Sequence, residues 1–540
     1  MQSWQEVERY PSGMEMSPLP RASTADLIPA PKHSGLTANL LFLVLLLTLG
    51  TGIPLGYNIV ALNAPQTVIV NWIRSVGCRR IHNFSSVGPE NSRNTSRFEL
   101  WCHMINDSSD DQLMVTLAEN PELNTIWALT SALFSLGGIM SVFTTGYLMK
   151  VYGLKSSILM HAAILIVGTG ISCLSDQAQS YEMLIFGRVI VGVAVGSGNV
   201  LVPIYISEIS PVALRGALGT LPTTMFILGM IIATTLGLPY VMGNEQQWPL
   251  YLALHLVPVL VMCAGLSFCP ESPRQLFARN AETDAAQKAL IWLRKSNDVQ
   301  EELLAIQAER DREKVGHQLS LLGLFRDPFL RSALWLCVVP MIAMHTSGFS
   351  CLSFYSTFIF SASGLSPLNS IYASLGLWTT FLFMNLTSLV LVDRNGRRVL
   401  LLTSHVGVLI SLGFLVLTIN LTKQGFVGSA YGSVTCIFAF IVFHGLSLMS
   451  VPWILGAELF TQEARPAAMM FVSIVCWGTE LVAILLFPLV IAQAGEFTFC
   501  IFIGFIVLTG SFTFWALPET KGSSMEEIQT LLQVRFDKNK

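Results

Sequence analysis

Long runs of apolar residues dominate this chain, and short polar segments separate them. A helix needs about 20 apolar residues to cross the hydrocarbon core of a bilayer. Runs of that length lie near residues 38–60, 125–149, 156–175, 182–207, 216–240, 248–269, 332–360, 368–392, 399–420, 430–456, 466–492 and 496–517. The pattern therefore predicts an all-α membrane protein with twelve transmembrane helices.

The polar positions between these runs repeat from one half of the chain to the other. Glu208 and Arg215 are seven residues apart at the end of one apolar run, and Glu458 and Arg465 have the same spacing in the second half. Each half also ends in a similar motif, PESPR in the first and PETKG in the second. A membrane chain built from two related halves is typical of a transporter, in which the halves rock about a central site.

The repeat divides the chain into two six-helix domains with a linker between them. The predicted segments are an N-terminal stretch 1–36, an N-terminal domain 37–269 with a long loop at 61–124, a linker 270–331, a C-terminal domain 332–517 and a tail 518–540. The first stretch is rich in Pro and Ser, which predicts disorder. In the linker, apolar residues recur at helical spacing among charges, which predicts two or three short amphipathic helices.

Composition agrees with a membrane protein and excludes several functions. The chain is 52% hydrophobic and only 12% charged, whereas soluble domains carry about 25% charged residues. Its net charge of −3 gives no electrostatic reason to expect a nucleic-acid partner. We find no zinc-type Cys and His spacing, no phosphate-binding loop and no nucleophile elbow. We therefore expect a protein that is not an enzyme and has no cofactor.

The distribution of basic residues predicts the orientation in the membrane. They gather in the short loops of one side, at Lys150, Lys155, Arg215, Arg394, Arg397, Arg398 and Arg465, while the opposite side has only Lys423. Basic loops stay cytoplasmic. Both termini and the linker are therefore predicted to be cytoplasmic, and the loop at 61–124 extracellular.

The predicted extracellular loop carries features of an oxidising compartment. Asn83, Asn94 and Asn106 each begin a glycosylation sequon, and glycosylation needs the lumenal side. Cys78 and Cys102 are the only cysteines outside the predicted spans. They either form a disulfide on that side or remain two free thiols.

Charged residues at the predicted cytoplasmic ends of the spans suggest a gate. Opposite charges there can pair across the two halves when the cytoplasmic face closes, and such pairs bias a two-state equilibrium. The candidate gating residues are Glu208, Arg215, Glu271, Arg397, Arg398, Glu458 and Arg465. The alternative is that these residues only anchor helix ends at the lipid headgroups.

Several motifs together resemble those of the sugar porters of the major facilitator superfamily, within the facilitative hexose transporters. They are GYN at 56–58, NAPQ at 63–66, Gly187 with Arg188, PESPR, DRNGRR, AELF followed by RPAA, Pro452 with Trp453, Trp477, and PETKG. The resemblance covers residues 38 to 525. It implies a major facilitator fold, alternating access, and passive transport of a hexose across the plasma membrane, with the sugar and the lipid bilayer as partners.

The central site departs from the family pattern. The family reads sugar hydroxyls with Gln and Asn amides, but Thr223, Phe381 and Cys476 stand at three of those positions. The candidate pocket residues that the resemblance implies are Thr223, His345, Ser350, Tyr355, His444, Trp453, Trp477 and Glu480. Because the amides are replaced, a different solute such as urate or a polyol is an alternative substrate.

His444 favours the branch of the family that includes fructose transporters, which has a histidine at the matching place. Trp453 instead resembles the glucose-transporting branch. The alternative for His444 is a buried packing histidine.

Glu480, His345 and His444 are ionisable groups within predicted spans, and such groups usually face a polar interior. They could couple transport to protons, but proton-coupled sugar porters carry an acid in the first span, and LLTLGTGIPLGYN has none. We therefore expect passive transport. A non-transporting nutrient sensor is a further alternative, although the short segment after PETKG lacks a long signalling tail.

Overall fold

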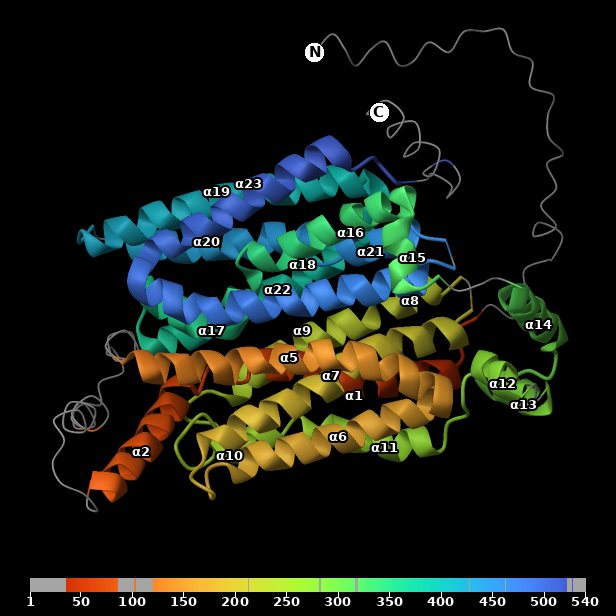
Figure 1. Ribbon diagram of the computed structural model, residues 1–540, viewed down its shortest axis with the longest axis horizontal. Coiled ribbons are helices and arrows are strands. Elements are labelled where there is room, and N and C mark those ends of the chain that lie inside the picture. The colour runs from red at the N-terminus through yellow and green to blue at the C-terminus, as the bar shows by residue number, and fades with distance from the viewer. Residues whose placement is uncertain are drawn as a thin grey trace, which may run out of the picture.

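The computed structural model describes residues 35–85, 102, 120–211, 213–280, 283–315, 319–426, 428–461, 463–521 and 527. Every regular element in these residues is a helix. The long helices form two bundles that lie side by side with their axes roughly parallel (Figure 1). Residues 1–34 of the predicted disordered stretch 1–36 and most of the predicted tail 518–540 lie outside the described residues.

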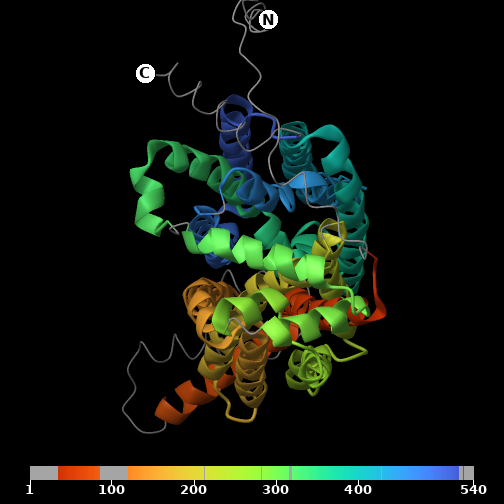
Figure 2. The same ribbon diagram turned by 90° about the vertical axis from the view of Figure 1, so that its right-hand side faces the viewer.

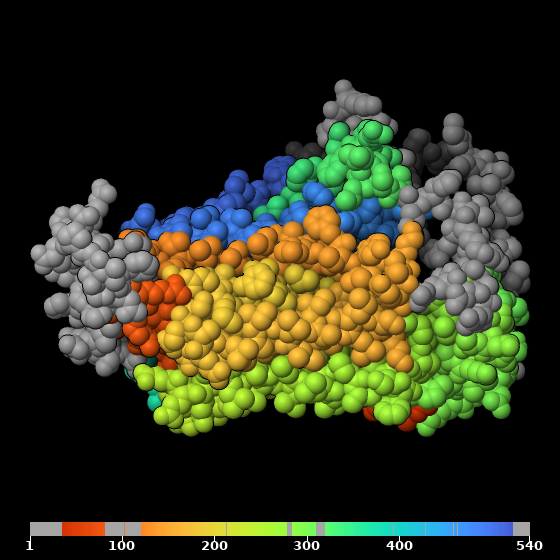
Figure 3. Space-filling model, turned by 60° about the horizontal axis from the view of Figure 1, so that its bottom comes forward, coloured from red at the N-terminus to blue at the C-terminus, as the bar shows by residue number. Residues whose placement is uncertain are grey.

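The first bundle contains the helices that precede the linker. They are α1 (Ala38–Val60), α5 (Pro121–Tyr152), α6 (Leu154–Leu174), α7 (Tyr181–Ile209), α8 (Arg215–Gly219), α9 (Leu221–Leu236), α10 (Trp248–Ala253) and α11 (Leu256–Ser267). In a space-filling view, the first-half helices form one continuous block along the second half (Figure 3).

The second bundle repeats this arrangement after the linker. It contains α16 (Pro328–Thr346), α17 (Phe349–Ala362), α18 (Pro367–Asn395), α19 (Arg397–Lys423), α20 (Ser429–Phe443), the π-helix η5 (His444–Leu448), α21 (Val451–Glu458), α22 (Arg465–Ala494), the 3₁₀ turn η6 (Gly495–Phe497) and α23 (Thr498–Ala516). Several predicted spans are therefore made of two shorter helices.

The described residues contain eleven segments that are long and apolar enough to cross a membrane. Ten of them correspond to single predicted spans. The last, Arg465–Ala516, has 52 residues and contains both α22 and α23, which the sequence predicts as two spans. Gly495, with φ of 55°, lies at the break between these two helices.

Small residues allow the first-half helices to approach closely. A Cβ atom added at Gly192 of α7 would lie 2.0 Å from the Phe134 carbonyl oxygen of α5, and one at Gly56 of α1 would lie 1.7 Å from the Phe226 carbonyl oxygen of α9. Because lipid is as apolar as a leucine side chain, close backbone packing of this kind is what holds membrane helices together.

Four short helices lie in the predicted linker at one end of the bundles (Figure 2). They are α12 (Pro273–Asn280), α13 (Thr283–Arg294), α14 (Gln300–Val315) and α15 (Leu321–Arg326). Arg294 donates to the Ile209 carbonyl at 2.9 Å and forms an ion pair with Glu302 at 2.6 Å. Asn39 also donates to the Trp292 carbonyl at 2.8 Å. These contacts fix α13 and α14 to the first bundle, at what we call the linker end.

The predicted loop at 61–124 begins with a helix that the apolar pattern did not indicate, α2 (Gln66–Ser85). It diverges from the bundles at the end opposite the linker, which we call the α2 end (Figure 1). Cys78 of α2 forms a disulfide with Cys102, which resolves the choice between a disulfide and two free thiols. Arg80 forms an ion pair with Glu182 at 2.5 Å, and this carboxylate raises the pKa of the Arg80 guanidinium.

Candidate functional site at the centre of the two bundles

The first feature of the centre is a break between α16 and α17. Gly348 has φ of +102°, a backbone region that favours glycine. The α17 segment is itself kinked at Tyr355, with φ of −135° and ψ of 25°. Discontinuous helices in transporters free backbone groups from the helical ladder and place them at binding sites. The break therefore marks the level of the bundle at which a solute can be bound.

His345 and Ser350 flank this break and contact each other. The Nδ1 atom of His345 lies 2.7 Å from the Ser350 hydroxyl, and its Nε2 atom lies 3.1 Å from the Cys476 thiol of α22. His345 is buried. Since a neutral imidazole has one donor and one acceptor nitrogen, both ring nitrogens are occupied within the protein.

His444 begins the π-helix η5 and is held in one orientation. Its Nε2 atom lies 3.1 Å from the Met344 carbonyl oxygen, and a carbonyl only accepts, so Nε2 carries the proton. Its ring stacks on Phe349, with centroids 4.3 Å apart and planes 5° apart. The Nδ1 atom is buried and has no hydrogen-bond partner among the described residues. It therefore presents a free acceptor lone pair, and π-helical turns often occur at functional sites.

Glu480 and Trp477 of α22 face the first bundle. The Ser135 hydroxyl of α5 donates to the Glu480 carboxylate at 3.1 Å. Trp477 meets Phe134 edge-on, with centroids 6.1 Å apart, and a Cβ atom at Gly138 would lie 2.3 Å from its ring. These side chains therefore lie at the contact between the two halves.

The other predicted pocket residues lie around this centre. The Tyr355 hydroxyl of α17 donates to the Ile484 carbonyl at 3.2 Å, and its ring stacks on Phe487. Thr223 and Trp453 are half-buried in α9 and α21. The contacts thus bring His345, Ser350, His444, Trp477 and Glu480 into one region, while Thr223 and Trp453 do not take part in them.

Sequence reasoning missed the side chains that join the two bundles at the α2 end. Asn63 donates to the Ser353 carbonyl at 2.6 Å, and Asn124 donates to the Pro488 carbonyl at 2.9 Å. The hydroxyls of Tyr240 and Tyr372 lie 3.1 Å apart. Each contact crosses from the first half to the second. Asn63 belongs to the NAPQ motif, which was the only signal in the sequence.

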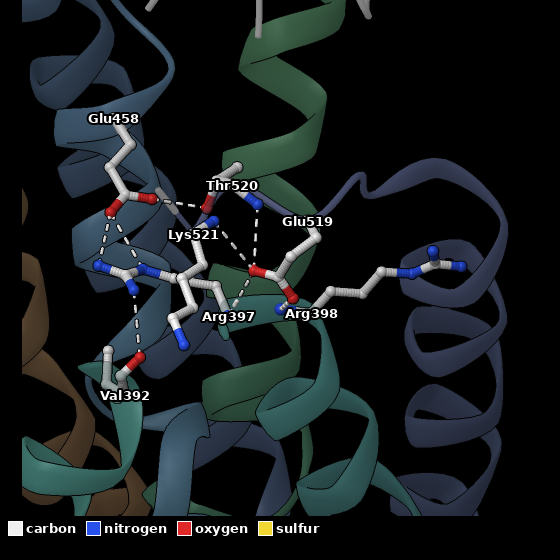
Figure 4. A network of polar contacts seen from close by, with 7 residues as sticks. All are labelled: Val392, Arg397, Arg398, Glu458, Glu519, Thr520 and Lys521. Atoms are coloured by element: carbon white, nitrogen blue, oxygen red, sulfur yellow. Dashed lines mark hydrogen bonds and ion pairs between the residues drawn. The ribbon is translucent and has the colours of Figure 1, made fainter. Parts of the chain in front are cut away.

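At the linker end, charged residues of the second half form a network (Figure 4). Arg397 forms an ion pair with Glu458 at 2.9 Å, and the Thr520 hydroxyl donates to the same carboxylate at 2.6 Å. The Glu519 carboxylate accepts from the backbone N–H groups of Arg397 and Arg398 at 2.7 and 3.1 Å. The network fixes the start of α19 to the end of α21 and to the PETKG motif.

The first half contains a related network. The Glu271 carboxylate accepts from the Lys155 backbone N–H at 3.1 Å, as Glu519 does from Arg398. The Ser272 hydroxyl donates to Glu208, as Thr520 does to Glu458. Gly153 and Gly396 both have φ of 86°, which places Leu154 at the position of Arg397. The first-half network therefore has an apolar side chain where the second half has a guanidinium.

These contacts show what the predicted gating residues do in this conformation. The contacts of Glu208, Glu458 and Arg398 described above lie within one half, and Arg465 donates to the Phe460 carbonyl at 3.2 Å. Arg215 begins α8. Pairing of these charges across the two halves remains a prediction.

The predicted glycosylation sites cannot be placed on the structure. Asn94 and Asn106 lie outside the described residues, and Asn83 lies in α2 with its side chain outside them. All three remain predictions.

Comparison of the sequence with known proteins places the matches in one family. The sequence profile of the family described as "Sugar (and other) transporter" matches residues 43–532. The facilitated glucose transporter member 3 of Homo sapiens is 31% identical over 492 residues, covering 91% of this chain and 92% of the relative. Member 1 of Gallus gallus is 34% identical over 406 residues, covering 75% and 82%.

A solved structure has the same fold. The xylose transporter XylE from E. coli, in a partially occluded inward open conformation, matches with a TM-score of 0.69 at 18% identity. The match covers 90% of this chain and 100% of that one.

Proposed function

The chain belongs to the sugar transporter family, and we propose that it is a facilitative transporter that moves a hexose across the plasma membrane by alternating access. Twelve transmembrane helices in two six-helix domains would rock about the central site. Both termini and α12–α15 would be cytoplasmic, so the α2 end would be extracellular. Contacts between the halves at the α2 end support a conformation closed to the outside.

His444 is the observation that carries the substrate proposal. Its free Nδ1 lone pair can accept from a sugar hydroxyl, while Nε2 and the Phe349 ring hold the imidazole in place. A positioned polar group with a fixed orientation is how a pocket recognises one hydroxyl pattern. We propose fructose as the preferred hexose, with glucose as the next candidate.

Glu480 supports a second candidate, a polyol. A carboxylate accepts several hydroxyl donors at once, and Glu480 has only the Ser135 hydroxyl as a partner in the contacts described. A polyol chain offers many such donors.

Uptake of a labelled panel in proteoliposomes tests the proposal. The panel contains fructose, glucose, galactose, a hexitol and urate, each measured against the others as competitors. We expect saturable uptake of fructose that competes with glucose. Saturable uptake of only the hexitol or urate would replace the hexose by that solute, and no uptake of any would favour a sensor.

A further inference from the structure

Glu480 is a buried carboxylate at the middle of the contact between the two halves. It lies halfway along α22, is 6% exposed, and accepts one hydrogen bond from Ser135, which is 0% exposed on α5. Ser135 is likewise near the middle of its helix. The pair therefore lies deep in the bundle, where α5 and α22 pack closely against each other.

The described groups around Glu480 do not include a partner of opposite charge. Cys476 lies one turn earlier on α22 and contacts His345 of α16. Tyr355 of α17 donates to a backbone carbonyl, and Arg188 of α7 donates to the Asn58 carbonyl at 2.9 Å. Among the described residues, no lysine or arginine forms an ion pair with Glu480.

An ionised carboxylate with one neutral hydrogen bond is costly in such a place. A buried charge needs an opposite charge or several donors to offset its lost hydration, and a carboxyl inside a membrane bundle is expensive for the same reason. Protonation removes this cost. Separation of α5 from α22 also removes it, because water then reaches the carboxylate.

We propose that Glu480 is a proton-binding site that controls the contact between the two halves. The state in which α5 and α22 are in contact holds a proton on Glu480, and the separated state releases it to water. The contact state binds one more proton, so falling pH favours it. Linkage for one proton limits the change in the ratio of the two states to about tenfold per pH unit.

This proton site goes beyond passive transport without contradicting it. Protonation stabilises the contact whether or not a sugar is bound, so it changes the rates of the conformational steps without driving accumulation. The inference rests on the rocking of two halves in the proposed function but not on the identity of the substrate.

A distance measurement without substrate tests it. Tyr240 and Tyr372 lie on opposite halves at the α2 end and are exposed, so Tyr240→Cys with Tyr372→Cys can carry two spin labels. Cys500 is exposed and is replaced by Ser. Double electron–electron resonance on the purified full chain, at pH values from 5 to 9, then reports the populations of near and far labels.

In the parent protein we expect the near population to grow as the pH falls. The ratio of near to far populations should change by up to about tenfold per pH unit. Glu480→Gln, which mimics the protonated side chain, should give a large near population at every pH. Glu480→Asp should keep a pH response. Glu245→Gln removes an exposed carboxylate close to one label. Its pH response should be the same as that of the parent protein.

Two results would overturn the proposal. One is a distance distribution of the parent protein that does not change with pH, which needs no variant that might misfold. The other is a Glu480→Gln protein that keeps the pH response of the parent. If the pH response is present but no hexose is transported, the proton site stands and the proposed substrate fails.

Discussion

His444 shows how one side chain can be fixed by its neighbours and still leave an atom for a ligand. The bond to the Met344 carbonyl and the stack on Phe349 use one nitrogen and one face of the ring. The remaining nitrogen is a buried acceptor. Sequence could propose a histidine in the pocket, but the tautomer follows only from the tertiary contact.

We predict that His444→Ala weakens hexose affinity. A buried hydroxyl that loses its partner costs about 1–3 kcal/mol, which corresponds to roughly five- to a hundred-fold in affinity. The KM for fructose uptake, measured at equal surface expression, checks this. His405→Ala is the matched control, because His405 is also buried but bonds to a carbonyl of its own helix, that of Leu401. An unchanged KM for His444→Ala would indicate that His444 only packs in the core and does not bind the sugar.

At the scale of elements, the break between α16 and α17 and the two charged networks set the geometry of the centre and of the linker end. The break joins His345 to Ser350. The networks hold the ends of α19 and α21 in the second half and of α6 and α7 in the first. These local structures repeat the internal symmetry of the sequence, with Leu154 as the exception.

Gly348→Ala should destabilise the break. A left-handed backbone costs an L-residue about 1–2 kcal/mol, and the added Cβ atom would lie 2.9 Å from the Phe502 ring. We expect a lower midpoint of thermal unfolding in detergent. Gly413→Ala in α19 is the control, since its Cβ atom would meet nothing within 4 Å and alanine favours a helix. Equal midpoints for the two variants would contradict the role of Gly348.

Arg397→Ala should loosen the contact between α19 and α21 and reduce transport. The variant loses charge-assisted hydrogen bonds to Glu458, each of which contributes about 1.5–3 kcal/mol, in a network that is only partly exposed. Initial uptake rates at matched surface expression measure the loss. Lys423→Ala removes an exposed basic residue paired with Glu496 at the α2 end and should transport normally. Normal transport by Arg397→Ala would indicate that the network only anchors helix ends at the lipid headgroups.

At the scale of the whole molecule, two halves meet at the α2 end and are covered by α12–α15 at the linker end. The proposed orientation puts the disulfide between Cys78 and Cys102 on the oxidising side. With that orientation, the contacts between the halves at the α2 end correspond to a conformation closed to the outside. Topology and energetics are therefore the properties to test at this scale.

Glycosylation tests the topology. Replacement of Asn83, Asn94 and Asn106 by Gln should abolish the gel-mobility shift that deglycosylation produces, because the orientation proposed places all three outside. Asn385 also begins a sequon but lies inside α18, so Asn385→Gln is the control and should leave the shift unchanged. A shift that survives the triple replacement means either that Asn420, which also begins a sequon at the α2 end, carries the glycan or that the proposed orientation is wrong.

Energetics can be tested with an imposed pH gradient. The described part of α1 contains no acidic residue, so we expect uptake that equilibrates the hexose and does not concentrate it. Internal and external concentrations in proteoliposomes, acidic outside, give the measurement. Accumulation that collapses with a protonophore would show proton coupling, and Glu480→Gln would then identify the carrier.

The sequence by itself determined the long helices, their pairing into two halves and the family. Apolar length is a local property, so α1 was predicted with its observed bounds, Ala38–Val60. The repeated Glu and Arg spacing and the terminal motifs also needed no tertiary information. Helix α2 was missed because it is not apolar enough to resemble a span.

Only the tertiary structure decided which side chains meet. The bond between Ser135 and Glu480 joins positions 345 residues apart, and that between Asn124 and Pro488 joins positions 364 apart. No local pattern encodes such pairs, because they depend on how two bundles pack. The disulfide partner of Cys78, the orientation of His444 and the absence of an ion-pair partner for Glu480 among the described residues were decided in the same way, by packing and by the burial it imposes.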